Sequence, residues 1–383
     1  MSSLNIFAGL FLAVSIVFAQ AQAPSTEMKR GLEYEKQGNY ALAEDAFKTV
    51  SDAAPGDAQA WAHLGLDRAL QGKYADAVPA YRKAIKLAPK FPGLQMNLGL
   101  ALFKEGQFQE AIPALLAAST EAPQDNRPKL LLGMSYYGLA QYPKAVPYLK
   151  SSVQASPDNL GIRTALAQSC LWAAQYNCVL EQYKIILQQD PDSAQADMFA
   201  GEALDGQGNT TGAVAQFRAA AKASPNMPNV HFGLGYLLWK LKQMDEAERE
   251  FKLELALDPN HQQALTYLGD IALKRNDNDI ARNYLTRAVE QKGPVRLAYL
   301  DLGILNAASH RNSEAEADLK RAIAMDPTEP DAHWRLARLL QTMGDKAQAD
   351  MEFAKVKNLH QTKDRKDEAL VQKMTSPSPV QQP

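Results

Sequence analysis

The pattern of small and apolar residues in this chain repeats every 34 positions. A small residue stands at that interval ten times without a slip, and twelve residues after it a second small residue follows. Apolar residues around both have the three-and-four spacing of an amphipathic helix. The pattern therefore predicts ten helix pairs. The first small residues are Gly31, Gly65, Gly99, Gly133, Ala167, Gly201, Gly235, Gly269, Gly303 and Ala337, and the second are Ala43, Ala77, Ala111, Ala145, Val179, Ala213, Ala247, Ala281, Ala315 and Ala349.

The two small residues of a unit predict where its two antiparallel helices cross, because small side chains let helices approach closely. A large apolar residue follows the second small residue by four positions, which places both on one helix face. These large residues are Phe47, Tyr81, Leu115, Leu149, Tyr183, Phe217, Phe251, Leu285, Leu319 and Phe353.

Turn residues separate the predicted helices. Proline follows the second helix of most units and is expected to end it, while the eighth unit has Gly293 and Pro294 instead. Glycine or asparagine often stands between the two helices, where a positive φ is expected. The prolines are Pro55, Pro89, Pro123, Pro157, Pro191, Pro225, Pro259 and Pro327, and the turn residues are Gly38, Gly72, Gly106, Gly208, Asn276 and Gly344.

This arrangement resembles the tetratricopeptide repeat (TPR) family, over about residues 24–361. The resemblance implies an all-α solenoid, a right-handed superhelix of about ten 34-residue helix-turn-helix repeats. Ala167 and Val179 depart from the family pattern and predict looser packing in the fifth unit. Residues 362–374 are expected to form a C-terminal capping helix, and residues 375–383 a disordered tail.

The amino-terminal residues predict export. Residues 4–19 are an uncharged apolar run, and Ala19-Gln20-Ala21 after it has the small-x-small pattern of a signal-peptide cleavage site. We therefore expect residues 1–21 to be a signal peptide cleaved after Ala21, which predicts a periplasmic or secreted protein. An uncleaved membrane anchor is the alternative, because residues 1–5 carry no lysine or arginine.

Charge and motifs argue against nucleic acid binding and catalysis. The formal net charge of -2 provides no basic field for a phosphate backbone. The histidines lack metal-binding spacing, and the glycines between Gly206 and Gly212 miss the known phosphate-loop spacings. No nucleophile signature occurs. We expect no cofactor, no metal and no enzymatic activity.

The chain contains two cysteines, Cys170 and Cys178, which bracket the turn of the fifth helix pair. An oxidising compartment permits a disulfide between them. Two small buried apolar side chains are the alternative.

The family resemblance implies that the first helix of each unit lines a concave binding groove. Its second, fifth, ninth, twelfth and thirteenth positions are then candidate contacts for a protein or peptide partner, and Trp172, Trp334 and Arg338 extend this set. A core role is the alternative for an aromatic stripe at helical spacing. The main candidates, including Asn97 beside the groove positions, are Leu66, Met96, Asn97, Leu100, Phe103, Leu130, Met134, Tyr137, Asn229, Phe232, Tyr236 and Trp239.

These observations predict a non-enzymatic protein–protein interaction scaffold of the cell envelope. Two alternatives stay open: a structural protein that self-associates as a homo-oligomer, and an accessory subunit that presents substrates to an enzyme acting in trans. A membrane contact is expected only through an uncleaved amino-terminal segment.

Overall fold

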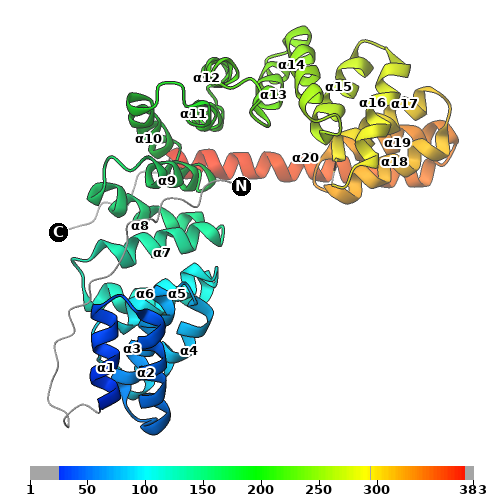
Figure 1. Cartoon of the computed structure of the whole chain (residues 1–383). Coiled ribbons are helices and arrows are strands. Elements are labelled where there is room, and N and C mark those ends of the chain that lie inside the picture. Colours follow the sequence, from blue (N-terminus) through cyan, green and yellow to red (C-terminus); the bar gives the residue numbers. More distant parts are fainter. Residues whose placement is uncertain (1–25, 294, 376–383) are drawn as a thin grey trace, which may run out of the picture. The chain divides into compact units, whose positions relative to one another are not determined.

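The computed structural model describes residues 26–293 and 295–375, which form helices with no strand among them. The predicted signal peptide and all but the first residue of the predicted tail lie outside the described residues. The chain divides into two compact units, unit 1 ending at Gly208 and unit 2 beginning at Asn209. In both units, successive helices form antiparallel pairs that follow one another in chain order (Figure 1).

Unit 1 contains the first five helix pairs and the first helix of the sixth. Its helices are α1 (Thr26–Lys36), α2 (Tyr40–Ala53), α3 (Ala58–Leu70), α4 (Tyr74–Leu87), α5 (Leu94–Lys104), α6 (Phe108–Glu121), α7 (Asn126–Gly138), α8 (Tyr142–Ala155), α9 (Leu160–Trp172), α10 (Tyr176–Gln189) and α11 (Ala194–Gly206).

Unit 2 contains the remaining helices, and its last helix differs from the prediction. No glycine or proline lies between Lys346 and Thr375, so residues 362–374 continue the last helix of the repeats instead of forming a separate capping helix. The helices are α12 (Thr210–Ala223), α13 (Val230–Lys240), α14 (Met244–Leu257), α15 (Gln262–Lys274), α16 (Asn278–Glu290), α17 (Arg296–Ala308), α18 (Asn312–Met325), α19 (Pro330–Met343) and α20 (Lys346–Thr375).

The prolines end the second helices as predicted. In all eight repeats that carry the proline, the second helix ends two residues before it, as α2 ends at Ala53 before Pro55. The predicted turn residues also adopt positive φ, for example 77° at Gly72 and 64° at Asn276. Other units place Ala140, Ala174 or His310 in the same left-handed conformation, which costs more for residues with a Cβ.

The glycines make room for the large apolar residue of their own unit more than for the alanine that we expected to face them. A Cβ built on Gly65 would lie 2.7 Å from Cδ1 of Tyr81, and one on Gly31 would lie 2.7 Å from Cζ of Phe47. The same overlap, with leucine or phenylalanine, occurs at Gly99, Gly133, Gly235, Gly269 and Gly303.

Two of the ten repeats carry alanine in place of this glycine, and the large apolar residues of these two repeats are less buried. Tyr183, in the unit of Ala167, and Phe353, in the unit of Ala337, are half-buried, whereas the corresponding residues of the other eight units are buried. This agrees with the looser packing expected for the fifth unit.

A recurring hydrogen bond ties the start of many units to the preceding turn. A side chain six residues after the proline places a nitrogen near the proline carbonyl oxygen, at distances from 2.7 to 3.3 Å. Arginine, lysine, tryptophan and histidine all serve in this place, so the geometry is kept while the residue type varies. The residues are Trp61, Lys129, Arg163, His231 and His333.

Within unit 1 and within unit 2, helices pack mainly against helices that are near them in the sequence. The substantial helix–helix contacts join helices that are adjacent or next but one, such as α3 with α4 and α3 with α5. From α3 to α11 in unit 1 and from α13 to α19 in unit 2, the first helices of successive repeats therefore contact one another, as in a repeat solenoid.

Candidate partner-binding surfaces

Four aromatic side chains gather on two neighbouring first helices of unit 2. Phe232, Tyr236 and Trp239 follow one another along α13, with ring centroids 6.4 and 6.3 Å apart. Tyr267 of α15 packs edge-on against Trp239, with centroids 5.0 Å apart, and against Tyr236 at 5.5 Å. All four side chains are half-buried, so each ring packs on a neighbour and presents part of its surface to solvent. We call these four residues the aromatic surface.

Polar contacts fix the orientation of the aromatic surface. The Trp239 indole N–H donates to Oδ2 of Asp270 at 2.6 Å, and the Lys274 ammonium donates to the same oxygen at 2.6 Å. The Lys274 nitrogen also lies 4.6 Å from the Trp239 ring centroid. Burial, and then the nearby Tyr236 and Asp270, raise the pKa of Tyr267 to about 12. The ring of Trp239 is thus held between a carboxylate and an ammonium group.

The sequence predicted three of these four residues. Asn229, also predicted, is exposed at the start of α13 in a left-handed conformation with φ of 67°. Tyr267 was not predicted, because it does not stand at one of the expected groove positions of α15. In the sequence it is visible only as an aromatic residue two positions before Gly269. That pattern does not indicate a contact with α13 unless the position of the neighbouring helix is known.

The predicted contacts in unit 1 are mostly half-buried as well. Met96 is buried, with 5% of its surface exposed, and so differs from the expectation of a groove position. The Tyr137 hydroxyl donates a hydrogen bond to Oε1 of Gln168 of α9. This bond joins the fourth repeat to the fifth. The half-buried residues are Leu66, Asn97, Leu100, Phe103, Leu130, Met134 and Tyr137.

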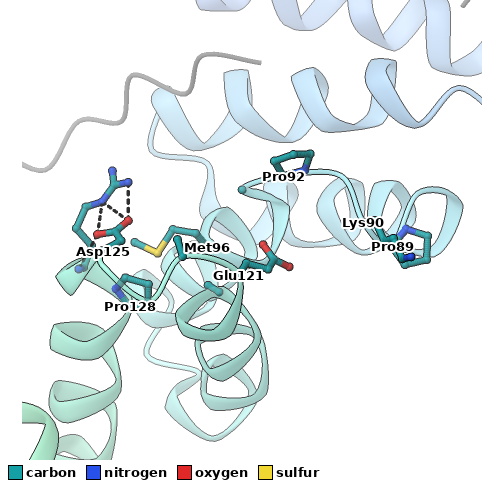
Figure 2. Close-up of a pocket in the computed structure, with 11 residues that line it drawn as sticks. Pro89, Lys90, Pro92, Met96, Glu121, Asp125 and Pro128 are labelled. Carbon is teal, nitrogen blue, oxygen red and sulfur yellow. Dashed lines mark hydrogen bonds and ion pairs between the residues drawn. The ribbon is translucent and has the colours of Figure 1, made fainter. Parts of the chain in front are cut away.

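Met96 lies in the wall of a pocket of about 510 Å³ between the turns that precede α5 and α7 (Figure 2). Pro92, Pro128 and Glu121 also line it. Burial raises the pKa of the Glu121 carboxyl. Its lining combines prolines and alanines with the charged residues Lys90, Glu121, Asp125 and Arg127, of which Asp125 and Arg127 form an ion pair.

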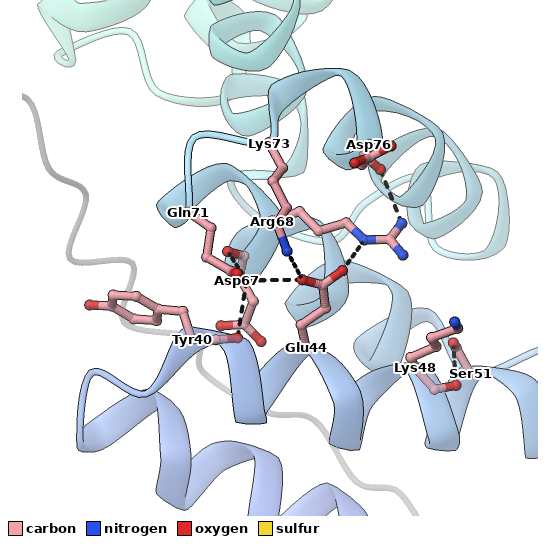
Figure 3. Close-up of polar contacts among 9 residues, drawn as sticks. All are labelled: Tyr40, Glu44, Lys48, Ser51, Asp67, Arg68, Gln71, Lys73 and Asp76. Carbon is pink, nitrogen blue, oxygen red and sulfur yellow. Dashed lines mark hydrogen bonds and ion pairs between the residues drawn. The ribbon is translucent and has the colours of Figure 1, made fainter.

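Glu44 of α2 is the centre of a polar cluster between the first two repeats, α1–α2 and α3–α4 (Figure 3). Its carboxylate accepts hydrogen bonds from Arg68 at 2.9 Å, Gln71 at 3.0 Å and Lys73 at 2.8 Å. Partial burial opposes ionisation, but these hydrogen bonds outweigh it and lower the pKa of Glu44 to about 2. The carboxylate therefore stays charged and ties α2 to α3 and the turn after it.

Asp67, close to this cluster, is fully buried. No donor reaches either of its carboxyl oxygens within the described structure. Burial, together with the negative charges of Glu35 and Glu44, raises the pKa of Asp67 to about 9. A protonated Asp67 can donate to the Glu35 carboxylate, which also lies 2.7 Å from Nδ1 of His63.

Cys170 and Cys178 form a disulfide in the structure, with their Cα atoms 5.9 Å apart. The bond joins α9 to α10 across the turn at Ala174. Trp172 beside it is 63% exposed and stacks on Tyr142 of the preceding unit, with ring centroids 6.1 Å apart.

Neither a metal site nor a membrane span is present within the described residues. No group of three histidine, cysteine or carboxylate side chains there has an arrangement that holds a metal ion. None of the described helices is long and apolar enough to cross a membrane.

The repeats match a known family along most of the chain. The sequence model described as Tetratricopeptide repeat matches residues 28–90, 64–126, 180–228, 200–262 and 266–330, and a second model of the same description matches residues 307–365. The chain belongs to the tetratricopeptide repeat family. Such repeats are generally non-enzymatic scaffolds for protein–protein interaction, and this TPR chain has that architecture.

Individual relatives of the TPR chain are distant. It is 34% identical over 109 residues to Cellulose synthase 1 operon protein C of Komagataeibacter xylinus, a match that covers 28% of this chain and 8% of that protein. It is 26% identical over 129 residues to BBSome complex member bbs-4 of Caenorhabditis elegans, covering 34% and 28% respectively. The chain thus matches less than a third of the length of either relative.

The solved structure of Pseudomonas aeruginosa pilF has a TM-score of 0.48 to this TPR chain at 19% identity, and the match covers 54% of this chain and 94% of that one.

Proposed function

We propose that this TPR protein is an exported, non-enzymatic scaffold that binds a protein or peptide partner on the first helices of its repeats. The observation that carries the proposal is the aromatic surface of α13 and α15. Its rings are half-exposed and are held in place by Asp270, Lys274 and one another. Rigid aromatic side chains supply contact area at low entropic cost, which is why such groups dominate protein interfaces.

The location in the cell envelope is part of the proposal. The apolar run at residues 4–19 and the small residues at its end support export. The disulfide between Cys170 and Cys178 supports an oxidising compartment. Amino-terminal sequencing of the protein purified from its own cells is expected to begin at Gln22. A chain that begins at Met1 and stays in the cytoplasmic fraction would sink the export proposal.

Site-specific crosslinking tests partner binding at the aromatic surface. A photoreactive amino acid is placed at Tyr236 in the full-length chain, and a matched chain carries it at Leu253 of α14. Leu253 is 46% exposed and makes a control position within the same unit. After irradiation in cells, we expect a discrete adduct from position 236 that is missing from position 253.

The adduct also decides between the proposed scaffold and self-association. A different protein in the adduct, identified by mass spectrometry, supports the scaffold. An adduct that contains only a second copy of this chain favours the self-associating structural protein. Equal adducts from both positions, or none from either, contradict binding at the aromatic surface.

A further inference from the structure

Positive charge surrounds the aromatic surface. The Lys242 ammonium lies 5.7 Å from the Trp239 ring centroid, and the Lys240 ammonium lies at the same distance from the Tyr236 ring. The Lys274 ammonium lies 4.6 Å from the Trp239 ring centroid. The carboxylate of Asp270 contacts Trp239, and its side chain is 6% exposed and paired with Lys274.

The same combination of an indole and two cations recurs on the first helix of the last unit. Trp334 of α19 is 40% exposed. The guanidinium carbons of Arg335 and Arg338 lie 5.1 and 5.5 Å from its ring centroid. Both arginines are exposed, and neither has an ion-pair partner among the described residues.

The two aromatic–cation groups belong to one row of helices. Within unit 2, α13 contacts α15, α15 contacts α17, and α17 contacts α19. Trp334 and Arg338 occupy the repeat positions that Phe232 and Tyr236 occupy in α13, three repeats of 34 residues earlier. Between them α17 contributes half-buried apolar side chains, Leu297 and Ile304.

The acidic side chains of these four helices are either paired with a basic residue or buried. Asp270 pairs with Lys274, and Asp331 pairs with Arg296. Asp301 is buried, and burial, followed by the charge of Asp270, raises its pKa well above the usual range. Lys242, Arg335 and Arg338, in contrast, are exposed and lie beside the rings, although the whole chain carries a net charge of -2.

We propose that the first helices of unit 2, α13, α15, α17 and α19, bind an acidic protein segment that also carries apolar or aromatic side chains. Its apolar side chains lie on the aromatic surface and on Trp334, and its carboxylates meet Lys242, Arg335 and Arg338. Complementary charge sets the register and speeds association, and the rings supply the buried contact area. This inference rests on the proposed scaffold function and specifies the chemistry of its partner.

The test begins with a random peptide library displayed on phage and selected on the full-length chain. Recovered peptides are expected to be rich in aspartate and glutamate and to contain aromatic or large aliphatic residues. Their affinities are then measured by fluorescence anisotropy for three chains: the parent, Lys242→Glu with Arg338→Glu, and Lys222→Glu with Lys357→Glu. The last pair carries the same change of charge at exposed positions of α12 and α20.

We expect the Lys242→Glu, Arg338→Glu chain to bind at least about tenfold more weakly than the parent, and the control chain to bind within about twofold. Affinity for the parent is also expected to fall as salt is raised. Trp334→Ala, at an exposed site, is expected to weaken binding as well. Circular dichroism of each variant verifies that its helices are intact.

Three outcomes overturn the acidic-segment proposal while leaving a scaffold function in place. Peptides that bind the aromatic surface but lack acidic residues are one. Affinities equal in the charge-reversed and control chains are the second. The third is a single-stranded oligonucleotide that binds the parent more tightly than the peptides and is lost in the same variant. Failure of the crosslinking at Tyr236, in contrast, contradicts the scaffold proposal itself.

Discussion

The glycine at the crossing of most helix pairs leaves the space that a large apolar side chain of the same repeat occupies. A Cβ at Gly65 would lie 2.7 Å from the Tyr81 ring, well inside van der Waals contact. The periodic glycine was visible in the sequence. The expected alanine also lies near it, since a Cβ at Gly303 would be 3.4 Å from the carbonyl oxygen of Ala315, but the large apolar residue is nearer and was not predicted as its neighbour.

Gly65→Ala is therefore expected to destabilise the protein. Crowding against Tyr81 costs about 1–3 kcal/mol, and the better helix propensity of alanine recovers up to about 1 kcal/mol. We expect a net loss of about 1–2 kcal/mol, measured by urea denaturation. Gly56→Ala is the control, because nothing lies within 4 Å of its added Cβ. Equal midpoints for the two variants would mean that the Tyr81 ring moves aside without cost.

Asp67 predicts an unusual pH dependence of stability. Its folded-state pKa of about 9 lies above the value of about 3.9 in an unfolded chain. The folded state thus holds the proton more tightly, so this stabilisation is complete below about pH 4 and is lost as the pH rises to about 9.

Asp67→Asn is expected to remove that dependence, since an amide keeps a donor toward Glu35 and never ionises. The variant should exceed the parent in unfolding free energy by about 1–3 kcal/mol at pH 9, and the difference should shrink toward pH 4. Chemical denaturation across this pH range measures both. A difference that is constant with pH would show that folding does not raise the pKa of Asp67.

At the scale of elements, the fifth helix pair departs most from its neighbours. It has Ala167 instead of glycine, a half-buried Tyr183, and Ala174 with a φ of 54° at its turn. Each of these features weakens a helix pair, and the disulfide between α9 and α10 compensates by closing a short loop in the unfolded chain.

Replacing Cys170 and Cys178 by alanine is expected to cost about 2–3 kcal/mol and to do so locally. Hydrogen exchange followed by mass spectrometry is expected to show faster exchange in α9 and α10 than in the parent, while α3 and α4 keep their protection. Reducing agent should reproduce the effect in the parent and leave the variant unchanged. Unaltered exchange in α9 and α10 would contradict the compensating role.

Most helix boundaries followed from local chemistry and were predictable, whereas contacts between neighbouring repeats were not. Proline acts on its own backbone and fixes where α2 or α4 ends, and the left-handed turn residue likewise fixes where α1 or α3 ends. Tyr267 and Lys274 reach Trp239 only because α15 lies beside α13. The end of α20 was not predictable in this way. Its sequence from Lys346 to Thr375 is polar and contains no helix breaker, so nothing in it marks where the helix of the last repeat would end.

At the scale of the whole molecule, packing that is local along the chain implies that damage spreads only to neighbouring repeats. A Cβ at Gly269 would lie 2.5 Å from Cγ of Leu285, which lies in the core shared by α15 and α16. Those helices make their substantial contacts with α13, α14 and α17. Gly269→Ala is therefore expected to speed hydrogen exchange from α13 to α17 and to leave α19 and α20 near parent rates, because stability in such arrays is a sum of repeat and nearest-neighbour terms. A uniform loss of protection through α20 would show that unit 2 unfolds as one cooperative core, in which case a partner bound at α13 would stabilise Trp334 and its arginines as strongly as the aromatic surface itself.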